Sequence, residues 1–250
     1  MMRLHKLLAS QGLGSRRAIE NWIKIGKIEV NGKVAHIGQQ VSPKDRIKVD
    51  GKFIEIANTP KETPRVLLYH KPEGEICSRV KEAGTASVFD NLPALKQERW
   101  VMVGRLDVNT SGLLLFTNSG ELAHKLMHPR FEVLREYAVR VLGKVTHEHL
   151  SNMRKGVMLS TGMSRFKQII PHQESEGANQ WFTVSLTQGK YREVRELFAS
   201  QGFTVSRLIR TKYGPISLPR NLRMGKYIEL GEDKVSGLMK LCLDANVVPA

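Results

Sequence analysis

The sequence has few of the features that mark membrane-spanning or secreted proteins. No apolar run approaches the roughly 20 residues that are needed to cross a bilayer, and the longest, residues 112–116, is strand-sized. Residues 1–10 lack the long apolar region and cleavage site of an export signal. The only two cysteines, Cys77 and Cys242, form no C-x-x-C pair. We therefore expect a cytoplasmic protein with free thiols that pack as small core side chains.

Several cofactor and nucleophile motifs are also missing. The chain has no G-x-x-x-x-G-K-[ST] phosphate loop, no G-x-G-x-x-G after a strand and no G-x-S-x-G elbow. His124 and His128 have zinc-ligand spacing, but the H-E-x-x-H pattern is absent and Pro129 ends that helix. If the protein is an enzyme, we expect it to need no cofactor and no metal.

What the sequence has in excess is positive charge. Its 250 residues include 39 Lys and Arg against 24 Asp and Glu, a net charge of +15. An apolar fraction of 41% fits an ordinary globular protein, so the surplus indicates a polyanionic partner. Without a membrane segment, nucleic acid is favoured over an acidic membrane.

Residues 1–60 read as a small basic α/β unit, with 11 basic and five acidic side chains. Leucines at 4, 7 and 8 share one face of a first helix, and Ser15 can cap a second. Asn31-Gly32 and Asp50-Gly51 favour hairpin turns. A solvated helix face is the alternative to an RNA-binding face. The basic side chains that we expect to contact RNA on the second helix are Arg16, Arg17 and Lys24.

After a linker at about residues 57–64, residues 65–245 alternate short strands and helices. Strands outnumber crossover helices, so the pattern favours an α+β domain with a mostly antiparallel sheet. The predicted strands are 66–69, 100–103, 113–116, 137–141, 182–186, 205–209 and 227–230. The predicted helices lie at about 120–127, from Thr146 to Gly156, around 194–198 and through 238–241.

The loop Gly104-Arg105-Leu106-Asp107 joins two of these strands and carries one acid beside one base. An acid held beside an arginine stays ionised, which suits a nucleophile or a cation stabiliser rather than a general acid. From these residues alone, a structural ion pair is as good an interpretation as a catalytic acid.

Two sets of motifs resemble known families. Leu-Leu-Ala-Ser, Gly-Ser-Arg-Arg and Gly-Lys-Ile-Glu-Val-Asn-Gly within residues 3–32 resemble the S4 RNA-binding domain. Gly-Arg-Leu-Asp followed by Thr-Ser-Gly-Leu-Leu resembles the signature of the RsuA/RluB/RluE/RluF family of pseudouridine synthases. Further blocks of that family match Lys71 to Gly74, Arg135 to Tyr137, Gly189 to Arg195, and Arg207 to Arg210 with Gly214.

The resemblance implies a domain with a central cleft, a reaction without cofactors and a set of site residues. Asp107 would attack the sugar or the base of a uridine or remove a sugar proton, and these choices stay open. Tyr137 would stack on the uracil, and Arg195 would pair with Asp107 and orient it. The remaining implied contacts to substrate or RNA are Leu208 and Ile209 on the pocket floor, Arg105 in the space vacated by a flipped base, and Arg210.

Within the family, Cys77-Ser78, the run at residues 89–93 and the run at 127–129 are most similar to the RluB type, which modifies large-subunit (23S) ribosomal RNA. We therefore expect an rRNA pseudouridine synthase that acts as a monomer on this RNA or an assembly intermediate of the ribosome. A non-catalytic S4-type RNA-binding or ribosome-assembly factor is the alternative, and an RNA N-glycosidase would need a further acid to activate water. Glu193 stands where many family members have Gln, but both side chains accept a hydrogen bond.

Overall fold

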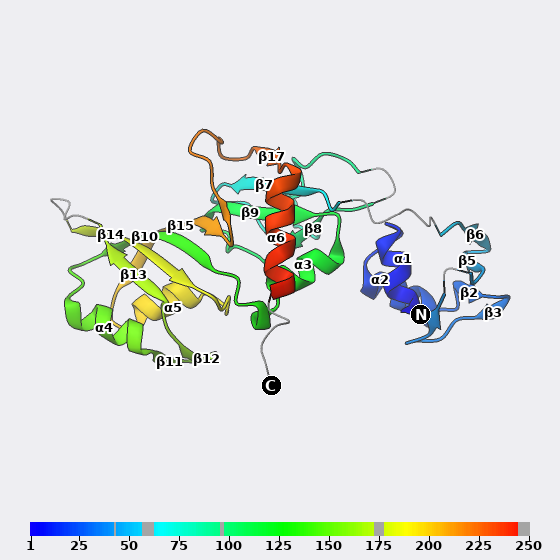
Figure 1. Cartoon of the computed structure of the whole chain (residues 1–250), viewed down its shortest axis with the longest axis horizontal. Coiled ribbons are helices and arrows are strands. Elements are labelled where there is room, and N and C mark those ends of the chain that lie inside the picture. Colours follow the sequence, from blue (N-terminus) through cyan, green and yellow to red (C-terminus); the bar gives the residue numbers. More distant parts are fainter. Residues whose placement is uncertain (43, 57–62, 96–97, 173–177, 245–250) are drawn as a thin grey trace. The chain divides into compact units, whose positions relative to one another are not determined.

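The computed structural model describes the whole chain except residues 43, 57–62, 96–97, 173–177 and 245–250, and for 242–244 it describes the backbone alone. The chain forms two compact units (Figure 1). The first contains Met1–Pro64, Pro93–Trp100 and Asn118–Gly120, and the second contains the rest. Among the described residues, no helix has the length and apolar character to span a bilayer. The limits predicted for the two domains, 1–60 and 65–245, stay a prediction, and most of the predicted linker lies outside the described residues.

The first unit packs two helices on short strands. Helices α1 (Leu4–Ser10) and α2 (Arg16–Lys24) precede a four-stranded sheet in the order β3-β2-β5-β6. A two-stranded sheet pairs β1 (Met2–Arg3) with β4 (Gln40–Val41). The strands of the larger sheet are β2 (Ile28–Val30), β3 (Lys33–Val34), β5 (Ile47–Val49) and β6 (Lys52–Ile54).

Local chemistry explains these elements. The Ser15 hydroxyl accepts a hydrogen bond from the amide of Ala18 at 3.0 Å and so caps α2, as expected. Asn31 and Gly32 both have positive φ angles, of 52° and 79°, and join β2 to β3 in a two-residue turn. The core of this unit contains the predicted leucines of α1 together with apolar residues of α2 and the strands.

The second unit is built on a nine-stranded sheet whose main order is β13-β14-β10-β15-β9-β7-β17. The pairing of β9 with β15 is parallel and the other pairings in this sheet are antiparallel, which confirms the predicted fold class. The strands are β7 (Val66–Lys71), β8 (Val101–Val103), β9 (Ser111–Thr117), β10 (Arg135–Leu142), β13 (Gln168–Pro171), β14 (Asn179–Leu186), β15 (Thr204–Tyr213), β16 (Ile216–Ser217) and β17 (Tyr227–Glu229). A separate hairpin joins β11 (Val157–Leu159) to β12 (Gly162–Ser164).

Helices cover the two halves of this sheet with separate cores. Apolar residues of α4 (His147–Lys155) and α5 (Glu193–Ala199) pack on β10, β14 and β15. Those of α3 (Gly120–Met127) and α6 (Glu232–Asp244) pack on β7 and β9, and Figure 1 shows the two helix pairs beside their respective halves. A short 3-10 helix, η1 (Pro129–Phe131), follows α3. The crossing from one half of the sheet to the other is the parallel contact of β9 with β15.

That contact depends on a glycine. Gly112 lies beside Arg210 with a φ angle of +108°, and a Cβ atom there would be 2.3 Å from the carbonyl oxygen of Arg210 and 2.6 Å from its amide nitrogen. Both neighbours are backbone atoms of the paired strand, which cannot move aside without parting the strands.

We predict that Gly112→Ala destabilises the protein by roughly 2–4 kcal/mol, the sum of backbone strain and a forced strand separation. Gly237→Ala is the matched control, because Gly237 lies inside α6 and its added Cβ would be 3.9 Å from Pro215. That change should stabilise the protein by roughly 0.5–1 kcal/mol. Urea unfolding of both variants measures the difference, and equal free energies of unfolding would contradict it.

Candidate active site

The loop that carries Asp107 runs from the end of β8 to the start of β9. Gly104 opens it with a φ angle of +75°, and the amide of Thr110 donates to the Asp107 carbonyl at 3.0 Å to close a turn. The Asp107 side chain keeps 32% of its surface exposed. Its carboxylate accepts no hydrogen bond from the described residues, so both of its oxygens are available to a substrate.

A buried lysine holds this loop through hydrogen bonds to its backbone. Lys71 ends β7 with 0% of its surface exposed, and its Nζ donates to the carbonyls of Pro72 and Thr110, both at 2.9 Å, with that of Val108 at 3.4 Å. The amide of Gly74 donates to the same Val108 carbonyl at 2.8 Å. Burial lowers the pKa of the Lys71 ammonium, and nearby acidic groups oppose that shift. The backbone after Asp107 is therefore held by a fully buried lysine side chain.

Arg195 fastens the same loop from α5. Its Nη1 donates to the carbonyl of Val205 at 2.9 Å and its Nη2 donates to that of Asn109 at 2.9 Å. Burial lowers the pKa of this guanidinium, the positive charge of Arg192 lowers it further, and Asp107 opposes the shift. Arg195 thus connects β15 with the loop that carries Asp107.

The expected pair between Arg195 and Asp107 is wrong in its geometry. The guanidinium within 4 Å of the Asp107 carboxylate belongs to Arg192, with Nη1 3.9 Å from Oδ2. Both side chains are about one-third exposed, so the attraction is weak. The physical reason is that Arg195 is committed to two carbonyls, and one of them lies in the loop itself.

Arg192 owes its position to the tight turn that starts α5. It has a φ angle of 50°, and the turn is closed by the Glu193 carboxylate, which accepts from the amide of Lys190 at 3.1 Å. Glu193 is buried and acts as the hydrogen-bond acceptor that the sequence predicts at this position. The Nζ of Lys190 donates to the carbonyl of Met163 at 2.6 Å, so the turn is tied to β12.

Tyr137 and Leu208 lie together on the side of the sheet that α5 covers. Both are buried in one apolar cluster, which also contains Leu106, the residue before Asp107. Ile209 does not belong to this group, because successive residues of a strand point to opposite faces. The strand therefore does not place Leu208 and Ile209 on one face, and a pocket floor formed by Leu208 stays a prediction. The Tyr137 hydroxyl makes no hydrogen bond to the described residues.

Arg210 differs from the expected RNA contact. It is only 2% exposed, its Nε donates to the carbonyl of Leu113 at 2.7 Å, and its guanidinium lies 5.1 Å from the centre of the Tyr213 ring. A side chain enclosed in this way cannot belong to a phosphate-binding stripe on the surface. By contrast, Arg105 is exposed, as a side chain that enters RNA must be.

The three basic residues singled out on α2 are also exposed, so the structure leaves them accessible to RNA. They are Arg16, Arg17 and Lys24. The described residues contain no group of three or more His, Cys, Asp or Glu side chains placed to hold a metal ion. The rings of His124 and His128 are tilted by 45° with their centres 5.4 Å apart, and His128 accepts from the amide of Arg130.

Sequence reasoning missed three contributors to the site. Lys71 lies in a motif that gave it no role, and its burial depends on carbonyls of the distant segment 108–110, which the sequence does not indicate. Arg192 was passed over because only a φ angle of 50° turns it toward Asp107. Cys77 is a free thiol, as expected, but its Sγ also accepts from the amide of Leu106 at 3.4 Å. Burial raises the pKa of that thiol.

Comparison with known proteins identifies the family of both domains. The family profile described as RNA pseudouridylate synthase matches residues 65–200, and that of the S4 domain matches residues 2–47. A crystal structure of a pseudouridylate synthase superposes with a TM-score of 0.65 at 24% identity, covering 95% of this chain and 100% of that one. This likeness shows the shared fold.

Relatives named ribosomal large subunit pseudouridine synthase B are much more similar in sequence. The Haemophilus influenzae protein is 50% identical over 241 residues, which cover 96% of this chain and 67% of that one. The Escherichia coli K12 protein is 48% identical over 96% of this chain and 82% of its own length. For the Pseudomonas aeruginosa protein, 48% identical over 93% of this chain, the match spans 60% of the relative. Because the synthase profile matches more than half of the chain and relatives at 48–50% identity cover most of it, the chain belongs to the RNA pseudouridylate synthase family and carries an S4 domain before its synthase domain.

Proposed function

We propose that this protein isomerises a uridine of large-subunit ribosomal RNA to pseudouridine, as a monomer in the cytoplasm. The observation that carries the proposal is the Asp107 carboxylate, which accepts no hydrogen bond from the described residues while its loop is clamped through backbone carbonyls. The relatives at 48–50% identity, whose names state this reaction class, support it.

The reaction breaks the N1–C1′ bond of uridine and forms a C1′–C5 bond after the base has turned. C5 gives up its proton, N1 gains one, and the product has the same atoms as the substrate. No electron pair leaves the system, so the chain's own side chains can supply all the required groups. Asp107 would either attack the sugar or the base, or remove a sugar proton.

The residues around Asp107 suit the retention of a free base. Tyr137 offers an aromatic ring in the cluster that contains Leu106, and Leu208 lies on the same side of the sheet. A uridine in a helix must leave the stack to expose C1′, and Arg105, which is exposed, would fill the gap. Arg192 places positive charge 3.9 Å from the Asp107 carboxylate, and Arg195 holds the loop that carries it.

The alternative function, a non-catalytic RNA clamp, is disfavoured by the same carboxylate. A surface that only grips RNA gains nothing from an ionised acid that faces a polyanion. The first unit would supply affinity through its exposed basic helix, as the S4 match supports.

The proposal predicts that deletion of the gene removes at least one pseudouridine from large-subunit rRNA. Wild type should restore the modification, whereas Asp107→Asn should not, because an amide cannot act as nucleophile or base. Carbodiimide-stop sequencing of rRNA reads each site. Asp233→Asn, an exposed carboxylate on α6, is the matched control and should restore it. Full restoration by Asp107→Asn would refute the assignment.

Lys71→Met tests the hydrogen bonds that hold the Asp107 loop separately from substrate binding. Loss of the ammonium removes its hydrogen bonds to the carbonyls of Val108 and Thr110, and a loop displaced by about 1 Å can cost on the order of 10²-fold in rate. We expect kcat to fall by about that factor with KM within about threefold, since Lys71 cannot touch RNA.

Steady-state kinetics on an rRNA fragment measure both constants, and Lys234→Met, an exposed lysine on α6, should leave both unchanged. A rise in KM with wild-type kcat would mean that Lys71 acts in substrate binding and not by holding the Asp107 loop. Urea unfolding of the same preparations establishes that the variant is folded.

A further inference from the structure

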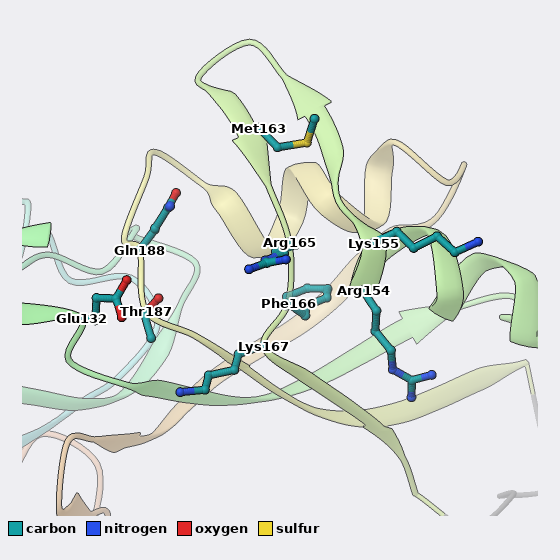
Figure 2. A pocket seen from close by; sticks show the side chains of 9 residues that line it. All are labelled: Glu132, Arg154, Lys155, Met163, Arg165, Phe166, Lys167, Thr187 and Gln188. Atoms are coloured by element: carbon teal, nitrogen blue, oxygen red, sulfur yellow. The ribbon is translucent and has the colours of Figure 1, made fainter. Parts of the chain in front are cut away.

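A basic hollow lies in the second unit, and apart from Met163, whose carbonyl accepts from Lys190, its lining residues take no part in the site described above. It has a volume of about 710 Å³. Its walls come from the end of α4, the segment between β12 and β13, the strand-to-helix connection before α5, and the residue after η1. Figure 2 shows the side chains that line it.

Four cations line this hollow against one carboxylate. The cations are Arg154, Lys155, Arg165 and Lys167, and the carboxylate is Glu132. All five are exposed. Within the described part of the chain, Lys155, Arg165 and Lys167 pair with no acid closer than 4 Å. The hollow therefore holds an uncompensated positive charge, which attracts an anion.

The backbone that carries two of these cations is rigidly anchored. Between Arg165 and Lys167, the side chain of Phe166 is buried 5.6 Å from the ring of Phe198. The amide of Phe166 donates to the carbonyl of Met153 at 3.0 Å, and the amide of Lys167 donates to a strand carbonyl at 2.8 Å. Binding at this segment would not have to order the backbone first, which lowers its entropic cost.

The lining chemistry indicates which kind of anion fits. Small-molecule sites of this size are lined mostly by apolar and aromatic side chains, whereas here Phe166 is buried and Met163 is the other apolar contributor. In Figure 2, Arg165 and Lys167 extend toward the side of Thr187, and Arg154 lies on the other side of Phe166. Because the cations lie on both sides of Phe166, they suit an extended chain of phosphates better than a single ion.

The hollow is also connected to the site. Thr187 and Gln188 line it and lead directly into the turn that places Arg192 near Asp107. The same turn is tied to the hollow's wall through Lys190, which donates to the carbonyl of Met163. The hollow and the turn that carries Arg192 are therefore close to each other along the chain.

We propose that this hollow binds the sugar-phosphate backbone of the RNA substrate outside the modified nucleotide. The inference rests on the proposed function for the identity of the RNA. Arg165 and Lys167 contact phosphates, and Thr187 and Gln188 add neutral hydrogen bonds. Because phosphate contacts carry no sequence information, the hollow contributes affinity and register rather than choice of base.

The test compares two double variants of the full-length protein in binding to protein-free large-subunit rRNA fragment over a range of salt concentrations. Arg165→Gln/Lys167→Gln removes two cations of the hollow, and Lys234→Gln/Lys240→Gln removes two exposed cations of α6. The slope of log K against log salt is negative, and loss of two phosphate contacts should reduce its magnitude by about 1.4 to 1.8. The α6 variant should keep the wild-type slope.

Single-turnover pseudouridine formation at saturating RNA distinguishes failure of this proposal from failure of the proposed pseudouridine synthase activity. The hollow variant should keep a rate within about twofold of wild type while it binds roughly tenfold more weakly at low salt. Equal slopes for both double variants would overturn the proposal, whatever the activity. So would unchanged binding to protein-free RNA with lost binding to ribosomal particles, since the occupant would then be an acidic protein segment. If wild type makes no pseudouridine but the slopes differ as stated, the function fails and the RNA-binding hollow stands.

Discussion

The buried ammonium of Lys71 is the interaction on which the site depends. It places three donors among backbone carbonyls of Pro72, Val108 and Thr110. A buried lysine is costly unless its donors are satisfied, and here the same bonds that satisfy it fix the loop after Asp107. Arg195 repeats the arrangement from α5 through the carbonyl of Asn109. Two cations thus hold the loop through its backbone and leave the carboxylate unbound.

This division of labour explains why the expected ion pair is absent. A guanidinium bonded directly to Asp107 would occupy lone pairs that the proposed reaction needs free. Arg192 Nη1 lies 3.9 Å from Asp107 Oδ2, and its side chain is about one-third exposed. The Asp107 carboxylate therefore has a positive charge nearby but no hydrogen bond to it. Preorganised groups of this kind need little rearrangement when a substrate arrives. The strand pairing at Gly112 then connects the loop to the half of the sheet that supplies Tyr137 and Leu208.

The sequence predicted the larger elements because their signals are local. Apolar periodicity located the main strands and helices, Ser15 and Thr146 marked helix starts, and Asn31 with Gly32 marked a hairpin. In the second unit, β11, β12, β13 and β16 were missed, because each is only two to four residues long and shows little apolar alternation. Motifs brought Asp107 to attention, but they could not show that Arg210 is buried, since burial depends on strands distant in sequence. The contacts of Lys71 and Arg195 are equally non-local.

The central claim is that Asp107, held in this clamped loop, carries out the isomerisation. Formation of the C1′–C5 bond expels the proton from C5 of uracil, so rRNA labelled with tritium at C5 of uridine reports the chemical step directly. Purified wild-type protein should release tritium to water in proportion to the pseudouridine formed. Asp107→Asn that is folded and binds the same RNA should release none above background. Release by that variant at the wild-type rate would contradict the account.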